Sequence, residues 1–210
     1  MTPLPKPKYV TNADWEDAYR EGTPPWDAGK PHAELAHVLD QYRLRPQTVL
    51  EIGCGTGADA IVLARRRFEV TAIDCSPIAI ERARMRAEQH GALLHLVLGD
   101  VFEFANTSAQ FDLVYDSGLY HIIRQVRLDR YLDMLWRVTQ PGSYYLGLIG
   151  APSEAADDAP PQVSEDEIHN ELGRLFEPVH LQPTRLESAN PDVSYPAWSC
   201  LMRRPLVDVK

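Results

Sequence analysis

The chain of 210 residues is long enough for one α/β domain with a substantial buried core. Its composition, 44% hydrophobic and 24% charged, is that of a soluble globular protein. No apolar run approaches the roughly 20 residues that span a bilayer. The net charge of −9 disfavours a nucleic-acid-binding surface, which needs a concentrated basic face. We therefore expect neither a nucleic-acid partner nor a membrane partner.

The termini and the cysteines bear on the cellular compartment. Residues 1–10 contain three prolines and no apolar segment of the kind found in secretory signals. The three cysteines, Cys54, Cys75 and Cys200, form no C-x-x-C pair. An odd number of isolated cysteines favours reduced thiols over a disulfide framework or a zinc site. We expect a cytoplasmic protein without a bound metal, and the sequence leaves its oligomeric state open.

The N-terminal region predicts two helices joined by an aromatic loop. The first helix is expected over about residues 12–21, with Trp15 and Tyr19 on one face. A loop rich in Gly and Pro follows and carries Trp26. Pro31 then opens a second helix with an apolar stripe.

From residue 48 onward, short apolar runs alternate with helical patterns. The predicted strands cover residues 48–52, 69–73, 93–98, 111–115 and 144–149, and the predicted helices cover about 57–66, 77–89 and 122–138. Pro141-Gly142 is expected to turn the chain into the fifth strand. This alternation means βαβ crossovers and a mainly parallel, doubly wound sheet.

The C-terminal third completes the predicted fold. Residues 150–162 are acidic and rich in Ala and Pro, which is typical of a lid over a pocket or of a disordered insertion. Ser164 begins a capping box and a further helix, and segments 176–187 and 195–203 form an antiparallel hairpin at a sheet edge. We expect one Rossmann-like α/β domain with seven strands, divided into an N-terminal helical cap (1–45), a ligand-binding core (46–150) and a C-terminal part (151–210).

A glycine-rich turn after the first strand is the strongest functional signal. Val49 to Gly57 runs from a strand through three glycines into a helix, at the edge of the sheet where doubly wound folds bind ligands. The spacing also fits a dinucleotide site, G-x-G-x-x-A. Glu51 argues against that site, because its carboxylate would repel a pyrophosphate and attract a cationic amino acid. Asp74, about 20 residues past the turn, stands where a ribose partner is expected.

Four motifs in order make residues 46–150 similar to the class I S-adenosylmethionine (SAM)-dependent methyltransferases. In that family the first motif holds the methionyl part of SAM, and the acid after the second strand accepts the ribose hydroxyls. Later motifs read the adenine amino group and face the methyl-transfer site. The resemblance implies SAM as cofactor and S-adenosylhomocysteine (SAH) as product. It assigns the cofactor to Glu51, Gly53, Cys54, Gly55, Thr56, Gly57, Asp74, Cys75, Ser76, Asp100, Val101 and Asp116.

The N-terminal region resembles the thiopurine/thiol/halide methyltransferase group. The likeness rests on Trp15-x-x-x-Tyr19, Gly22, Pro25-Trp26-Asp27 and Gly29. In that group an N-terminal helix and loop fold over SAM, which implies that Trp15 and Trp26 contact the cofactor. Aromatic faces attract a sulfonium ion and exclude water, which agrees with this assignment. Trp15 and Tyr19 are also explained as core anchors of their helix.

The segment from Asp116 to His121 resembles the same group and departs from the Asn/Asp-Pro-Pro-Tyr/Phe of enzymes that methylate DNA and protein amino groups. It also lacks the Asp/Asn set of metal-dependent catechol methyltransferases. By analogy, His121 is placed to take a proton from a thiol or phenol, with Tyr120 as a positioning group. A thiolate or halide needs no base, so His121 is also explained as a helix-start residue and Tyr120 as pocket lining. The other six histidines show no ligand spacing and are read as structural or solvated.

The sequence therefore predicts SAM-dependent methyl transfer to a small-molecule nucleophile by direct in-line displacement. The expected acceptors are thiols, other soft nucleophiles, and hydroxyl groups of aromatic or heterocyclic compounds. A SAM-binding regulatory module without catalysis is an alternative from another class. A nicotinamide-dependent oxidoreductase is a third reading, because of the glycine spacing.

Overall fold

The computed structural model describes residues 9, 11–153 and 159–207. The strands are β1 (Thr48–Ile52), β2 (Glu69–Asp74), β3 (His95–Leu98), β4 (Phe111–Ser117), β5 (Thr139–Gly150), β6 (Glu177–Glu187) and β7 (Ser194–Arg203). The helices are α1 (Asn12–Glu21), α2 (Ala33–Gln41), α3 (Ala58–Arg65), α4 (Pro77–His90), α5 (Val101–Phe104), α6 (Tyr120–Val138) and α7 (Glu165–Glu171), and a 3₁₀ turn covers Leu172–Arg174.

The strands of the described residues form one seven-stranded sheet in the order β3-β2-β1-β4-β5-β7-β6. Strands β1 to β5 run parallel to one another, whereas β7 is antiparallel to both β5 and β6. The predicted doubly wound sheet with an antiparallel C-terminal hairpin is therefore confirmed. The carboxyl ends of the parallel strands lie along one edge of this sheet, which is the edge where such folds bind ligands.

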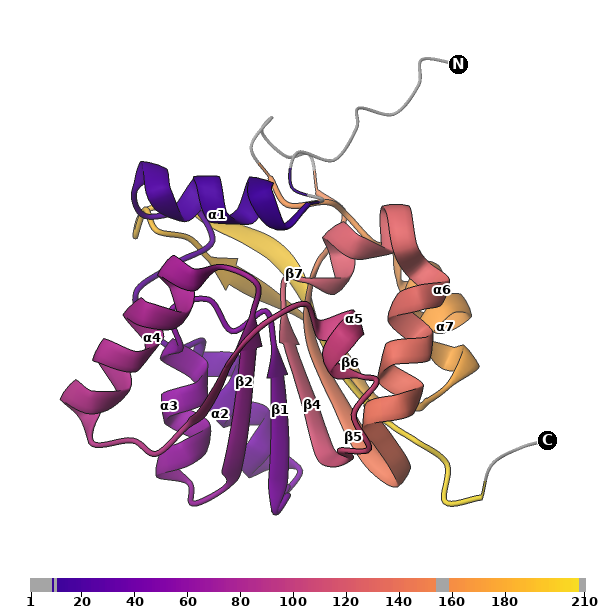
Figure 1. The fold of residues 1–210 in the computed structure, drawn as a ribbon. Coiled ribbons are helices and arrows are strands. Elements are labelled where there is room, and N and C mark those ends of the chain that lie inside the picture. Colours follow the sequence, from indigo (N-terminus) through magenta and orange to yellow (C-terminus); the bar gives the residue numbers. More distant parts are fainter. Residues whose placement is uncertain (1–8, 10, 154–158, 208–210) are drawn as a thin grey trace.

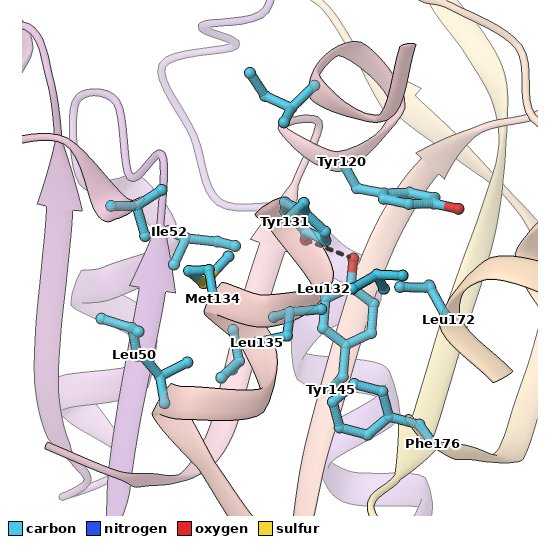
Figure 2. Packing of buried hydrophobic residues seen from close by; sticks show 14 of the residues in the cluster. Leu50, Ile52, Tyr120, Tyr131, Leu132, Met134, Leu135, Tyr145, Leu172 and Phe176 are labelled. Atoms are coloured by element: carbon cyan, nitrogen blue, oxygen red, sulfur yellow. Dashed lines mark hydrogen bonds between the residues drawn. The ribbon is translucent and has the colours of Figure 1, made fainter. Parts of the chain in front are cut away.

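Two apolar layers sandwich the sheet. Helices α2, α3 and α4 lie on one side of the molecule and α5, α6 and α7 on the other (Figure 1). Alternate residues of β1 serve the two layers, with Leu50 and Ile52 in the cluster around α6 and Val49 in the cluster around α2 and α3. All three side chains are fully buried. Burial of each such side chain stabilises the fold by roughly 1.5–3 kcal/mol, and Figure 2 shows the α6 side of this packing.

Helix α1 lies across the carboxyl edge of the sheet (Figure 1). Thr11 caps this helix and forms a capping box with Asp14, so its start agrees with the sequence prediction. Arg82 of α4 donates hydrogen bonds to the backbone carbonyls of Tyr19 (3.0 Å) and Gly22 (2.8 Å). These bonds fix the N-terminal cap against the body of the domain.

Three local predictions differ from the structure. Pro141-Gly142 lies inside β5 rather than in a turn before it, because a β-bulge at this end of the β4–β5 pair accommodates the extra residues. Helix α5 was not predicted, since its four residues are too few to show a helical period. Helix α2 begins at Ala33, two residues later than Pro31 suggested.

A break in α6 was also not predicted. Arg127 has non-helical backbone angles (φ −146°, ψ 35°) in the middle of the helix. Neither Gly nor Pro stands next to it, so no local sequence signal marks the break. The N-terminal part of α6 lies at the carboxyl edge of the sheet, because it directly follows β4 (Figure 1).

Among the helices built from the described residues, we find none that combines the length and hydropathy needed for a membrane span.

Two glycines with left-handed backbone angles offer a matched test of helix packing. A Cβ atom added to Gly57 (φ 75°) would lie 3.0 Å from the Cβ of Ala83, whereas one added to Gly91 (φ 60°) would contact nothing within 4 Å. Both substitutions by Ala carry the left-handed strain of about 1–2 kcal/mol. We expect Gly57→Ala to lower the free energy of unfolding by about 1 kcal/mol or more beyond Gly91→Ala, since it also separates α3 from α4. Urea denaturation measures both, and equal losses would contradict this packing argument.

Candidate functional site

A cavity of about 730 Å³ lies along the carboxyl edge of the sheet. It begins at the ends of β2 and β3, with Asp74 and Asp100 in its wall, and passes the turn after β4 at Ser117. Its other end is formed by the β6–β7 hairpin, where Leu186 and Tyr195 line it. The cavity therefore crosses most of the sheet, from an acidic end at Asp74 and Asp100 to a mixed end at the hairpin, where Glu187, Ser188 and Asn190 stand among apolar side chains.

Asp74 connects the turns that follow β1 and β2. One carboxylate oxygen accepts the backbone N–H of Gly55 at 2.9 Å, and the other accepts that of Ser76 at 2.9 Å. Burial raises the pKa of Asp74 despite these bonds. The carboxylate thus fixes the glycine turn against the start of α4, and Asp74 still lines the cavity.

The carboxyl groups of Glu51, Asp59 and Asp74 gather beneath the glycine turn. Glu51 is fully enclosed, its Oε2 makes no hydrogen bond with a described residue, and it does not line the cavity. Burial raises the pKa of Glu51 well above its ordinary value, and the charges of Asp59 and Asp74 raise it further. Such a cluster favours a cationic ligand and repels a phosphate.

The glycines of the turn have different neighbours. Gly53 lines the cavity, as expected for close approach of a ligand. A Cβ atom on Gly55 would instead lie 2.8 Å from the hydroxyl oxygen of Tyr19, and one on Gly57 would press on Ala83. Only the first glycine therefore serves the cavity, whereas the other two allow α1 and α4 to pack closely.

The other residues predicted for the first two motifs are partly structural. Cys54 is buried and its N–H donates to the Ile73 carbonyl. The Thr56 hydroxyl donates to Asp27 at 3.0 Å, and Ser76 caps α4. None of these three lines the cavity, whereas Cys75 does, and burial raises the pKa of its thiol to about 12.

Aromatic side chains from the N-terminal cap cover the acidic end of the cavity. Trp15 and Trp26 both line it, and their rings meet edge to face at 5.1 Å. The indole N–H of Trp26 donates to the Tyr19 hydroxyl at 3.1 Å, and Tyr9 stacks on Trp15. Tyr19 lines the cavity too, and since Tyr19 is buried whereas Trp15 is partly exposed, the core-anchor reading applies to Tyr19 more than to Trp15.

Asp100 and Val101, predicted for the third motif, also line the cavity. Asp100 caps the short helix α5 by accepting the N–H of Phe102 at 2.9 Å. Phe102 belongs to the wall as well, and sequence reasoning missed it, because the short helix that carries it was not foreseen.

Asp116 and Tyr120 lie outside the cavity wall. Asp116 is buried, and it accepts hydrogen bonds from the backbone N–H groups of Leu119 (2.8 Å) and Tyr120 (3.0 Å) and from the Tyr131 hydroxyl. Burial raises the pKa of Asp116 to about 6. Its geometry differs from the predicted cofactor contact: it holds the start of α6 in place.

The position of Tyr120 corrects its predicted role in placing the acceptor. Its ring packs with Tyr131 in the core on the α6 side (Figure 2), and its hydroxyl donates to Glu171 of α7 at 2.7 Å. Arg124 also donates to Glu171. The side chain is therefore committed to the contact between α6 and α7, because helical periodicity directs it away from the cavity.

His121 lines the cavity and is almost fully buried. Its Nδ1 accepts the backbone N–H of Gly150 at 3.0 Å. Burial lowers the pKa of His121 to about 4. The ring is therefore neutral near pH 7, and with so low a pKa it is a weak proton acceptor. The predicted role as a general base does not agree with this environment.

Several wall residues carried no signal in the sequence. His32, read as structural, lines the cavity, and its Nδ1 contacts Asp59 at 3.0 Å. Ile122 and Ile123 at the start of α6 belong to the wall, as do Pro160 and Pro161 from the predicted lid. Residues 154–158 of that predicted lid lie outside the described residues. Leu186 and Tyr195 of the β6–β7 hairpin could not be predicted as wall residues from the sequence, because their place beside the cavity depends on the order of strands in the sheet.

Comparisons with known proteins identify the family. Residues 49–142 match a family model described as a methyltransferase domain. A 2-heptyl-1-hydroxyquinolin-4(1H)-one methyltransferase of Mycobacteroides abscessus is 28% identical over 78% of this chain and 73% of its own. A probable thiol methyltransferase 2 of Arabidopsis thaliana is 26% identical over 84% of this chain and 79% of its own. The chain is a class I SAM-dependent methyltransferase.

A solved structure has the same fold. It comes from work on the conversion of a disulfide bond into a thioacetal group during echinomycin biosynthesis. It superposes with a TM-score of 0.81 at 27% identity and covers 93% of this chain and 94% of its own. Because thiol and hydroxyquinolone methyltransferases are among its relatives, the methyltransferase lies close to the thiol methyltransferase group, as predicted, and the nicotinamide-dependent alternative is set aside.

The residues present fit SAM, the methyl donor of this family. Asp74 and Asp100 supply carboxylate oxygens at the end of the cavity where hydroxyl and amino donors of a nucleoside would bind. The buried Oε2 of Glu51 lacks a partner, and the surrounding carboxylates favour the positive charge that SAM carries. When bound, SAM supplies an activated methyl group, and the protein has to orient it, exclude water and hold the acceptor.

We expect Glu51, through its charge beneath the cavity, to make cofactor binding sensitive to pH. In the free enzyme Glu51 stays protonated at any pH below its raised pKa. The ammonium group of a bound cofactor would favour the ionised form of Glu51. We expect SAH binding to release a proton, so that affinity rises with pH until the raised pKa is passed. Titration calorimetry in buffers of different ionisation enthalpy measures this release. The release should vanish in Glu51→Gln, and a release that persists in that variant would contradict the assignment.

His121 makes fold stability sensitive to pH. Its pKa is about 4 in the folded protein and about 6.5 in the unfolded chain, so the unfolded chain binds a proton first as pH falls. The contribution of His121 to stability is full above pH 6.5 and is lost as pH falls toward 4. We expect the unfolding free energy of the wild type relative to His121→Gln to fall by about 2–3 kcal/mol between pH 7.5 and 4.5. Urea titrations at both values test this, and a constant difference would show that His121 is not a buried neutral ring.

Proposed function

We propose that this methyltransferase transfers the methyl group of SAM to a small aromatic or heterocyclic nucleophile, through a thiol or another acidic group. The observation that carries the proposal is a single cavity that offers carboxylates and aromatic rings at one end and continues past Ile122 and Ile123 to the hairpin. A volume of about 730 Å³ is within the ~300–1,000 Å³ range of small-molecule sites.

The two ends of the cavity suit the two ligands. The nucleoside part of SAM can donate hydrogen bonds to the carboxylate oxygens of Asp74 and Asp100. The faces of the aromatic rings above them attract its positively charged sulfonium. The hairpin part of the wall combines Leu186, Val193 and Tyr195 with the polar side chains of Glu187, Ser188 and Asn190. A wall that combines apolar surface with a few polar groups suits a small, partly apolar acceptor.

Direct displacement is the proposed chemistry. The nucleophile attacks the methyl carbon, and the carbon–sulfur bond to the sulfonium breaks, which leaves SAH as a neutral thioether. The protein has to place these atoms in line and keep water away. The hydroxyquinolone and thiol methyltransferases among the relatives support acceptors of this kind for the present enzyme.

A transfer assay tests the proposal. The enzyme is incubated with methyl-tritiated SAM and separate acceptors, namely aromatic thiols, hydroxyquinolones, phenols, hydrogen sulfide and iodide. We expect labelled product with at least one aromatic thiol or hydroxyquinolone and turnover at least ~100-fold lower in Asp74→Ala, because that change removes a buried carboxylate with two backbone partners. Asp133→Ala, on the exposed surface of α6, is the matched control. Absence of product from every acceptor, with SAH binding intact, would falsify the proposed acceptor class.

A further inference from the structure

The ring of His121 has a defined orientation in the wall of the cavity. Gly150 is the last residue of β5, and its backbone N–H points at Nδ1 over 3.0 Å. A peptide N–H is always a donor, so Nδ1 must present its lone pair. In a neutral imidazole the proton then resides on Nε2. The fold itself therefore selects the Nε2–H tautomer.

Charged neighbours do not disturb this state. Burial is the sole cause of the lowered pKa of His121, with no contribution from a charged side chain of the described residues. Hydrogen-bonded His–carboxylate pairs have the opposite arrangement, as at His32, whose Nδ1 faces Asp59. His121 has no carboxylate that would stabilise its protonated form after it accepted a proton.

Nε2 of His121, the ring nitrogen that Gly150 does not contact, lies on the cavity side of the ring. The Cε1–Nε2 edge borders Gly118, where an added Cβ atom would lie 3.5 Å from Cε1 and 3.8 Å from Nε2. Gly118 and His121 both line the cavity, and among the described residues Nε2 has no hydrogen-bond partner. Leu119, in the same segment, faces the first glycine of the turn, with its Cβ 3.6 Å from one added to Gly53. The unpaired donor therefore belongs to a segment, Gly118 to His121, that also contacts the glycine turn through Leu119.

We propose that His121 is a hydrogen-bond donor to the methyl acceptor and not its base, so that the enzyme selects acceptors that bind as anions. This inference rests on the proposed function and defines its substrate class as thiolates and ionised N-hydroxy or phenolic groups. The acceptor loses its proton to solvent before or during binding, and Nε2–H bonds to the anionic sulfur or oxygen. The anion then attacks the methyl carbon, and the electron pair of the breaking bond goes to the sulfonium sulfur.

The first test examines the tautomer in the free wild-type enzyme. In ¹⁵N-labelled protein, long-range proton–nitrogen correlation spectra distinguish a protonated ring nitrogen from an unprotonated one. We expect His121 to show an unprotonated Nδ1 and a protonated Nε2, unchanged between pH 5.5 and 9. Its signals are assigned by their loss in His121→Gln. A protonated Nδ1, or a titration midpoint between pH 6 and 8, would overturn the proposal without any reference to the acceptor.

The second test uses thiophenols whose para substituents change the thiol pKa. We expect the midpoint of the kcat/KM pH profile to follow the pKa of each thiol, because the acceptor ionises by itself. A midpoint that stays at one pH for all thiophenols would identify a base on the enzyme and overturn the proposal.

The third test separates donation from shape. His121→Leu removes the donor, and we expect it to raise the KM for a thiophenol by about tenfold, the value of one hydrogen bond, with a smaller change in kcat. His121→Gln retains an N–H donor and should recover part of this loss. The affinity for SAH is measured for both variants as a control, and a value equal to that of the wild type shows that the site is folded.

Equal KM values for the wild type and His121→Leu would refute hydrogen-bond donation by His121. Failure of the enzyme to methylate any acceptor would instead refute the proposed function, and the result on the tautomer would still stand.

Discussion

The hydrogen bonds of Asp74 to the turns after β1 and β2 are the interaction on which the site depends. Those two turns belong to different βα units, and their backbone N–H groups meet on one carboxylate. Because the bonds consume only part of the acceptor capacity of the carboxylate, Asp74 can still accept from a ligand. Its position is therefore set by the fold before the cofactor arrives, which lowers the entropic cost of binding. A side chain held only by the ligand would lack this preorganisation.

Charge then determines which nucleotide-like ligand the turn accepts. A strand, a glycine turn and a helix form equally well in dinucleotide-binding proteins, where the helix N-terminus attracts a pyrophosphate. Here Glu51, Asp59 and Asp74 lie beneath the turn, and burial raises the pKa of Glu51, with a further rise from the electrostatic repulsion of Asp59 and Asp74. A pyrophosphate would add to this repulsion, whereas a sulfonium amino acid reduces it. The same backbone geometry is thus specialised by three buried carboxyl groups.

The fold and the first half of the site could be predicted from sequence because both depend on local patterns. The strands β1 and β2, the caps of α1 and α4, and the acids after β2 and β3 follow from apolar periodicity and strand ends. Side-chain direction at the start of α6 could not be predicted, because no residue there marks how the helix packs. The sequence therefore suggested Tyr120 for the cavity, although its hydroxyl reaches α7, and it gave no sign of the break at Arg127. The hairpin wall depends on sheet order, which is a non-local property.

The two histidines of the cavity show why residue type alone does not define a chemical role. His32 and His121 both lie in the wall, and their Nδ1 atoms face opposite kinds of group. A carboxylate of Asp59 accepts from Nδ1 of His32, so the pKa of that ring is raised in spite of burial, which by itself lowers it. A peptide N–H of Gly150 donates to Nδ1 of His121, so nothing offsets burial and the pKa falls. The partner of one nitrogen thus decides whether the other presents a lone pair or a proton to the cavity. Since the partners come from α3 and β5, 27 and 29 residues away, this distinction exists only in the folded chain.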